Sequence, residues 1–330
     1  MTGKTICVAG ASGLVGANIT RAALARGYAV NGTMRDTVAP DKVPYLQALE
    51  GSEMLSLFQA DMAAEDGWDD ALTGADAVFI ACLIPTYKGP TGKPAKEMED
   101  EQGYAEIIMP TVNGCLNIMR AAGRQGVKNI IICSSTSSTN PIPPVAKKNE
   151  VDHWSDADQQ CRDKKYTSAT KTVMEKAAMD LAARQDQRLV IMLPTLMLGP
   201  MVMPGHAQAG FMGQLAKLVR GETGRHQAVP NDSSSMAHIH DVAALFLAAY
   251  ENPAASGRYF GVYDSWHWND IYGVLKGLVP ASGLPAPFEG EKAAPTGFDF
   301  KRRDSLGVNM RDIPTLLRDA VDWIKSDPFA

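Results

Sequence analysis

The fold is decided by residues 5–16, which read TICVAGASGLVG. The apolar run 5–9 is typical of a buried strand, and the amphipathic segment 14–26 predicts a helix that stops at Gly27. Glycines between a strand and a helix allow a tight turn and let the helix N-terminus approach a pyrophosphate. The stretch therefore predicts a dinucleotide-binding turn, with a glycine-rich turn that binds nothing as the alternative. The predicted contacts are Gly10, Ser12, Gly13, Leu14, Val15 and Gly16.

The alternation of apolar runs and amphipathic segments continues through most of the chain. Strands are predicted at 29–34, 55–59, 77–82, 129–133 and 189–193, and long helices at 104–125 and 168–184. Strands that alternate with helices are typical of parallel sheets with both faces covered. The sequence therefore predicts an α/β fold, a Rossmann-type doubly wound parallel sheet.

The end of the second predicted strand indicates which dinucleotide is bound. NAD sites usually place an acidic side chain there for the ribose hydroxyls, whereas this strand ends in Arg35. A guanidinium is a planar, bidentate donor suited to a 2′-phosphate, and Lys42 adds a second positive charge. Asp36 weakens the local positive field, so NADH and a merely solvated Arg35 stay open as alternatives. The sequence favours NADPH as the cofactor.

The pattern loosens after residue 195 into Gly-, Pro- and Met-rich loops, with helices predicted near 210–219, 240–250 and 313–325. We therefore expect an NADP-binding Rossmann domain over 1–195, plus about 236–262. A smaller C-terminal substrate-binding lobe is expected over 196–235 and 263–330. Long loops at the carboxyl ends of parallel strands are where α/β folds bind ligands.

Composition and charge narrow the class of protein. The 330 residues are 45% hydrophobic and 21% charged, which is ordinary for a globular protein. A net charge of −5 argues against a nucleic-acid partner, and the longest apolar stretch is broken by prolines, which argues against a membrane span. Five cysteines without a C-x-x-C pair indicate buried thiols in a reducing compartment. We expect no metal site, no signal peptide and a cytoplasmic location.

Several motifs together resemble one known family. They are GASGLVG at 10–16, TMRD at 33–36, QADM at 59–62, PTVNGCLNIMRA at 110–121, ICSSTSSTN at 132–140, WSDADQQCRDKK at 154–165, KTVMEKAA at 171–178, LPTLMLGP at 193–200 and AHIHDVAALFLAAYENPAASGRY at 237–259. They span nearly the whole chain. The chain resembles an extended short-chain dehydrogenase/reductase of the dihydroflavonol reductase and cinnamoyl-CoA reductase-like branch, in the NAD-dependent epimerase/dehydratase superfamily.

The resemblance implies roles for individual residues. Ser135 is implied to hydrogen-bond the substrate carbonyl, and Lys171 to hold the nicotinamide ribose and lower the pKa of a catalytic tyrosine. Asn140 matches a substrate-pocket position of flavonoid reductases. A homodimer is compatible with the family. The residues implied to contact the cofactor beyond the glycine turn are Arg35, Lys42, Asp61, Met62, Lys171, Pro194 and Thr195.

The catalytic tyrosine does not stand where the family has it. The family places it four residues before the lysine, but here Thr167 occupies that position and Tyr166 lies five residues before Lys171. Five residues turn an α-helix through about 500°, which puts two side chains on nearly opposite faces. A π-bulge, or a helix that begins after Tyr166, would bring the tyrosine back. We predict that Tyr166 is the displaced acid, with water or another residue as the alternative.

Three functions are compatible with these residues. The favoured one is an NADPH-dependent carbonyl reductase that acts on a small aldehyde or ketone, with Ser135, Tyr166 and Lys171 as catalytic residues. The second is a nucleotide-sugar epimerase or dehydratase, which needs no net supply of cofactor. The third is a non-catalytic NADP(H)-binding protein, for which the displaced tyrosine is the main argument.

Overall fold

The computed structural model describes residues 3–83, 85–208 and 210–329. A seven-stranded sheet forms its centre, and all of its neighbouring strands pair in parallel. In spatial order the strands are β10 (Gly257–Gly261), β7 (Arg188–Pro194), β5 (Asn129–Cys133), β4 (Ala77–Ile80), β1 (Thr5–Ala9), β2 (Ala29–Met34) and β3 (Leu55–Gln59). This order confirms the predicted doubly wound fold, since the chain reverses its direction of winding between β1 and β4.

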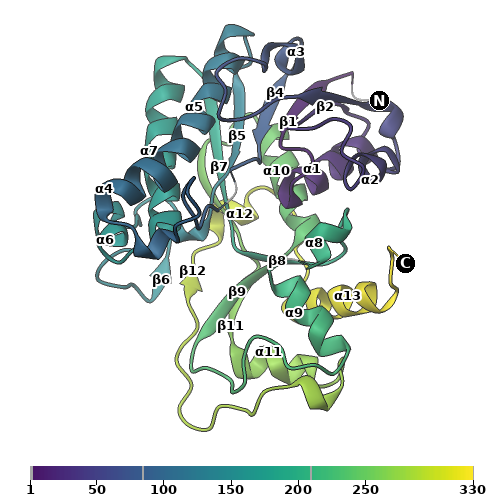
Figure 1. Cartoon of the computed structure of the whole chain (residues 1–330), viewed down its shortest axis with the longest axis vertical. Helices are drawn as coiled ribbons and strands as arrows, with labels where there is room; N and C mark the ends of the chain where they lie inside the picture. Colours follow the sequence, from purple (N-terminus) through teal and green to yellow (C-terminus); the bar gives the residue numbers. More distant parts are fainter. Residues whose placement is uncertain (1–2, 84, 209, 330) are drawn as a thin grey trace.

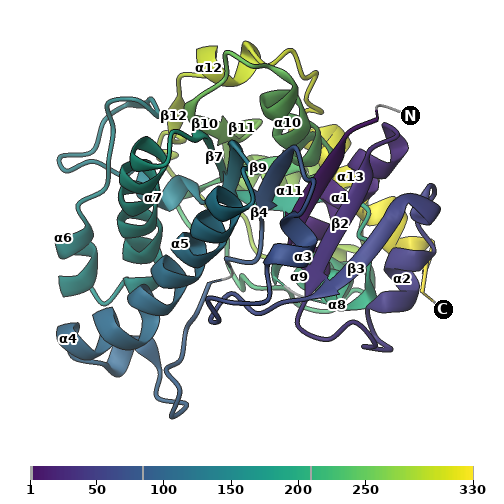
Figure 2. The same ribbon diagram turned by 90° about the horizontal axis from the view of Figure 1, so that it is seen from above.

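Helices cover both faces of the sheet (Figures 1 and 2). One face carries α5 (Met109–Arg124), α7 (Tyr166–Arg184) and the short α3 (Asp69–Leu72), and the other carries α1 (Leu14–Ala25) and α10 (Ile239–Glu251). The central strands β1, β4, β5 and β7 are apolar almost throughout because a parallel sheet with two covered faces buries both sides of its inner strands, whereas the edge strand β3 has no fully buried residue.

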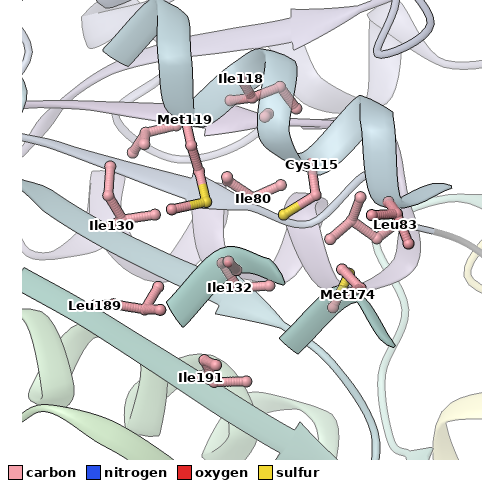
Figure 3. Close-up of a cluster of buried hydrophobic side chains, with 14 of the residues drawn as sticks. Ile80, Leu83, Cys115, Ile118, Met119, Ile130, Ile132, Met174, Leu189 and Ile191 are labelled. Atoms are coloured by element: carbon pink, nitrogen blue, oxygen red, sulfur yellow. The ribbon is translucent and has the colours of Figure 1, made fainter. Parts of the chain in front are cut away.

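The alternation of side chains along β5 shows how the two layers form. Ile130 and Ile132 belong to the core under α5 and α7, whereas Ile131 between them belongs to the core under α1 and α10. Figure 3 shows the first of these cores, where side chains from three strands meet α5 and α7. Its labelled members include Ile80, Ile130, Ile132, Leu189, Ile191, Cys115, Ile118, Met119 and Met174.

A smaller C-terminal lobe lies below the carboxyl ends of the central strands (Figure 1). Its three-stranded sheet has the order β11-β9-β8. The strands and helices of the lobe are β8 (Leu196–Leu198), α8 (Pro204–Gln208), α9 (Gly210–Val219), β9 (Ser233–His238), β11 (Asp264–His267), α11 (Trp268–Leu275) and α13 (Ile313–Lys325). A separate apolar core joins α9, α11 and α13. The lobe thus has its own interior.

Short elements complete the described chain. They are α2 (Val43–Gln47), α4 (Asp100–Gly103), α6 (Ala157–Arg162), α12 (Lys301–Asp304), the pair β6 (Lys147–Lys148) and β12 (Gly297–Phe298), and the 3-10 turns η1 (Ser52–Met54), η2 (Ala95–Glu97), η4 (Thr136–Ser138) and η5 (Ala281–Gly283). None of the helices in the ranges described above is both long enough and apolar enough to cross a membrane.

Two helices begin elsewhere than predicted. The helix predicted over 104–125 begins four residues earlier, because α4 (Asp100–Gly103) runs into it without a break. A π-helical turn, η3 (Tyr104–Ile108), follows α4, and α5 continues the helix. The helix predicted from 168 begins two residues earlier, at Tyr166, and is α-helical from there to Arg184. The π-helical turn therefore lies on α5 and not between Tyr166 and Lys171.

Candidate active site

The predicted cofactor residues lie at the carboxyl ends of neighbouring strands. Parallel strands all end at the same edge of a sheet, and the crevice between β1 and β4 opens there. One cleft at this edge is lined by residues that follow β1, β2, β3 and β4. The predicted residues among its lining are Gly10, Ser12, Gly13, Arg35, Lys42, Asp61 and Met62.

The glycine turn has the shape that a pyrophosphate needs. Gly10 has a φ of +87°, and a Cβ added there would lie 2.8 Å from Cys82, two residues after the end of β4. A Cβ on Gly16 would collide with the Gly10 carbonyl. Helix α1 begins after Gly13 without a side-chain cap or an acidic residue in its first turn. Its first N–H groups have no partner within the helix, so this turn fits a bound anion.

The basic residues lie where β2 ends. Arg35 is exposed and Lys42 is half-buried, and both line a cavity that they share with Ser12. Asp61 lies across the cleft after β3, where its carboxylate accepts a hydrogen bond of 2.9 Å from the N–H of Ala63. The cleft therefore joins the two basic side chains, which have Asp36 and Asp41 beside them, to the glycine turn. Such a pair of basic residues is what the sequence predicts for a dinucleotide with a 2′-phosphate.

Lys171 reaches the next part of the same edge from α7. Its Nζ donates a hydrogen bond of 2.7 Å to the carbonyl of Leu83, next to Cys82 in the chain, and the side chain is only 6% exposed. Burial lowers the pKa of Lys171 below its ordinary value. Burial also raises the pKa of Cys82 to about 12 and that of Cys133 to about 11, so both thiols are neutral. Lys171 thus contributes the basic side chain of this part of the site.

Ser135 follows β5, which lies beside β4 in the sheet. Its Oγ accepts a hydrogen bond of 3.2 Å from the N–H of Ser137, and the residue is half-buried. The preceding Ser134 donates its hydroxyl to Glu175, which lies one turn after Lys171 on α7. The strand end that carries Ser135 is therefore tied to the same helix as Lys171.

The structure does not bring Tyr166 to Lys171. The Tyr166 hydroxyl donates to Asp100 at 2.9 Å and lies 3.1 Å from the carbonyl oxygen of Met98, and the ring is 1% exposed. A Cβ on Gly103 of α4 would collide with the ring. Because α7 is a regular helix from Tyr166 onward, the five-residue spacing turns the tyrosine away from the lysine, and neither of the geometries that would correct it is present.

Thr167 lies on the face of α7 where the family has its catalytic tyrosine. It precedes Lys171 by four residues, so the two side chains share one face of the helix. Its Oγ1 donates a hydrogen bond of 3.0 Å to the carbonyl of Thr86, three residues after the Leu83 carbonyl that Lys171 holds. Both side chains therefore contact the loop that follows β4.

The remaining predicted residues have different surroundings. Pro194 ends β7 and Thr195 follows it, with the Thr195 hydroxyl donating to the Ser235 carbonyl at 3.0 Å. Asn140 is exposed, and its side-chain oxygen accepts a hydrogen bond from Lys148. Leu14, Val15 and Gly16 form the first turn of α1. Among the residues that the structure describes, no group of three or more His, Cys, Asp or Glu is arranged to hold a metal ion.

The sequence prediction missed several residues of the cleft. Ala60, Trp68, Ala81, Cys82 and Pro110 also line it. Ala81 and Cys82 are the last two residues of the strand predicted over 77–82, and in the structure they directly follow β4. Their place at the carboxyl end of a predicted buried strand is a signal that could have identified them. Pro110 and Trp68 carry no comparable signal, because only packing of the helical layer brings them to the cleft.

Known proteins share this architecture. A family model described as the NAD dependent epimerase/dehydratase family matches residues 6–262. Cinnamoyl-CoA reductase 1 of Arabidopsis thaliana is 31% identical over 325 residues, which cover 97% of this chain and 88% of the relative. Vestitone reductase from alfalfa (Medicago sativa L.) covers 99% of both chains with a TM-score of 0.77 at 24% identity. Yeast methylglyoxal/isovaleraldehyde reductase Gre2, solved in complex with NADPH, covers 98% of both chains with a TM-score of 0.78 at 16% identity.

Proposed function

Since this chain belongs to the NAD dependent epimerase/dehydratase family, we propose that it is an NADPH-dependent oxidoreductase that reduces the carbonyl of a small aldehyde or ketone. The family match confirms the resemblance drawn from the sequence motifs. Support for the reaction comes from the relative named cinnamoyl-CoA reductase and from the structural likeness to two named reductases. The observation that carries the proposal is the cleft that joins Arg35 and Lys42 to the glycine turn and leads toward Lys171.

Different residues of the cleft would contact different parts of the cofactor. The first turn of α1 would hold the pyrophosphate, and Arg35 and Lys42 would hold the 2′-phosphate. Asp61 and Met62 would border the adenine after β3, and Pro194 and Thr195 the nicotinamide side after β7. Bound NADPH supplies the hydride that the carbonyl carbon receives.

The chain itself must place the carbonyl and supply one proton to its oxygen. We assign the placement to Ser135, whose hydroxyl can donate to the carbonyl oxygen from the end of β5. We assign the proton to the buried amine of Lys171, because its lowered pKa makes the ammonium a stronger acid than a solvated lysine. We propose that Thr167 relays this proton, because it shares the helix face of Lys171 and its side chain contacts the same loop after β4.

Tyr166 has no part in this proposal. Its hydroxyl is bonded to Asp100 and Met98, and burial, followed by the Asp100 hydrogen bond, raises the pKa of the phenol above its ordinary value. A phenol that acts as the catalytic acid near neutral pH needs a lowered pKa and a path to the substrate. We therefore propose a structural role for Tyr166, as the anchor of α4 against the start of α7.

The proposed reduction is tested by measuring NADPH consumption and carbonyl reduction in the same sample. Purified protein is mixed with NADPH and a panel of aromatic and aliphatic aldehydes and ketones, and the loss of cofactor absorbance is compared with the alcohol formed. We expect equal amounts of NADPH consumed and alcohol produced. A reaction that changes the substrate while the amount of NADPH stays constant would instead indicate epimerase or dehydratase chemistry.

A second candidate function is a non-catalytic NADP(H)-binding protein. One observation favours it, because the tyrosine expected as the acid is turned away from Lys171. This candidate predicts that calorimetry detects NADPH binding while no member of the carbonyl panel is reduced. We expect no nucleic-acid partner and a cytoplasmic location, and size-exclusion chromatography would test for a homodimer.

The replacement Arg35→Ala is expected to weaken NADPH binding without weakening NADH binding. Losing one charged hydrogen-bonding partner of a phosphate costs about 1.5–3 kcal/mol, which raises the Kd for NADPH about 10–100-fold. Fluorescence titration of the reduced cofactors measures both constants. The exposed Arg184 at the end of α7 is a control, since its removal should change neither Kd. Equal weakening of both cofactors would contradict the assignment of Arg35 to the 2′-phosphate.

A further inference from the structure

One segment of the C-terminal lobe contacts the cofactor-binding half of the molecule. This segment consists of residues 199–203, which connect β8 to α8, and of α8 itself, which carries His206 and lies beside the start of α1 in Figure 1. Val202 and Met203 are buried in a small apolar core with Ala39, Val43 and Leu46. That core lies under the loop and short helix that follow Arg35 and carry Lys42. The lobe therefore supports the basic end of the cleft from below.

The same segment also contacts the glycine turn. The Nε2 of His206 is 3.1 Å from the carbonyl oxygen of Ser12, a residue 194 positions away in the chain. The other ring nitrogen, Nδ1, is buried and has no hydrogen-bond partner among the described residues. Burial lowers the pKa of His206; the hydrogen bond with the Ser12 carbonyl opposes this shift, and the Lys42 cation adds to it. The ring is therefore neutral, and because the Ser12 carbonyl can only accept, Nε2 carries the proton and donates it.

These two contacts meet around one cavity. Ser12, Arg35 and Lys42 line it together with the carboxylates of Asp36 and Asp41. The glycine turn lies on one side and the loop of residues 36–42 on the other. We propose that the C-terminal lobe takes part in selecting NADPH over NADH, with His206 as a positioning residue. In this assignment His206 holds the Ser12 side of the 2′-phosphate pocket, and Val202 and Met203 hold the Lys42 side.

The physical reason is the geometry of phosphate recognition. A phosphate is bound well only when several donors converge on it, so a small movement of one wall weakens charged hydrogen bonds that depend on distance and angle. The adenosine of NADH has no 2′-phosphate, so the affinity for NADH does not depend on how these donors are arranged. The inference rests on the proposed cofactor, because it assigns Ser12, Arg35 and Lys42 to the 2′-phosphate.

The test compares two replacements of His206 in the full chain. His206→Leu removes the donor to Ser12, whereas His206→Gln keeps a side-chain N–H at a similar reach. Isothermal titration calorimetry with NADP⁺ and with NAD⁺ gives the two dissociation constants of each variant. We expect His206→Leu to weaken NADP⁺ binding about tenfold, the effect of one hydrogen bond, and to change NAD⁺ binding less than about twofold. We expect His206→Gln to stay close to the wild type.

A matched control separates this effect from a general disturbance of the lobe. His226 is also in the lobe, where its ring contacts Trp268 and its Nδ1 lies 3.1 Å from the Tyr272 hydroxyl. His226→Leu should leave both dissociation constants unchanged. Thermal melting of each variant shows whether it is folded at the temperature of the titration.

Two results would overturn the inference. Unchanged NADP⁺ binding in His206→Leu would show that the contact with Ser12 does not support the pocket. Equal loss of NADP⁺ and NAD⁺ binding would show that His206 supports the glycine turn in general and not the 2′-phosphate pocket. A wild type that does not prefer NADP⁺ over NAD⁺ would contradict the proposed cofactor itself, and is thereby distinguished from a failure of His206 alone.

Discussion

Replacing Arg258 by methionine is expected to lower the free energy of unfolding by about 3–5 kcal/mol, the cost of leaving a buried charge without its partner. Arg258 on β10 pairs with Glu175 on α7 at 2.8 Å, and the two side chains are 3% and 0% exposed. The guanidinium also donates to the carbonyls of Glu150, His153 and Ser138, and it stacks on Trp154. Urea denaturation followed by circular dichroism measures the change.

The loss of unfolding free energy in Arg258→Met should depend on pH. Burial raises the pKa of Glu175 above its ordinary value of 4.5, and Arg258 opposes this shift. Without Arg258 the carboxyl remains buried, so its folded-state pKa lies further above 4.5 than in the wild type. A carboxyl with a raised folded-state pKa favours folding below its unfolded pKa, and this contribution is lost as the pH rises through the folded pKa. The deficit of the variant should therefore be smallest near pH 4.5 and should grow toward neutral pH.

Two further variants test the explanation. Arg26→Ala breaks the exposed pair of Arg26 with Glu251, whose side chains are 37% and 39% exposed, and should cost no more than about 1 kcal/mol. Combining Arg258→Met with Glu175→Met removes both charges and should recover part of the loss. A deficit in Arg258→Met as small as that of Arg26→Ala would show that the buried pair does not hold α7 against the segment 134–155.

The second large effect is expected on turnover. Lys171→Met should lower kcat for a reducible carbonyl by about 10²–10⁴-fold, the usual contribution of a general acid. Tyr166→Phe should leave kcat within about twofold of the wild type, because its hydroxyl lies on Asp100 and Met98 and not beside Lys171. Steady-state kinetics with saturating NADPH measures both values.

The two variants also differ in stability. Tyr166→Phe should lower the free energy of unfolding by about 1 kcal/mol, since it removes one hydrogen-bonding hydroxyl from a buried position. A large drop of kcat in Tyr166→Phe, with NADPH binding intact, would instead restore the tyrosine as the acid and would require α4 to move away from it. Such a result would also contradict the roles assigned here to Lys171 and Thr167.

Local sequence patterns were sufficient to predict the fold and about half of the residues that line the cleft. Strand and helix periods, together with the glycines at 10, 13 and 16, predicted the parallel sheet and the turn on which the cofactor site is built. The position of Arg35 at the end of β2 followed from the same reasoning, because the end of a parallel strand is also the edge of the crevice. Helical spacing also identified the conflict between Tyr166 and Lys171.

By itself, the sequence determined the order of elements, the glycine turn and the basic end of the cleft, since each depends on residues only a few positions apart. The tertiary structure alone decided where Tyr166 points, that Glu175 meets Arg258, and that His206 reaches Ser12. The partners in these contacts lie 66, 83 and 194 positions apart. No local period encodes such pairs, because they form only when packed layers bring distant segments together.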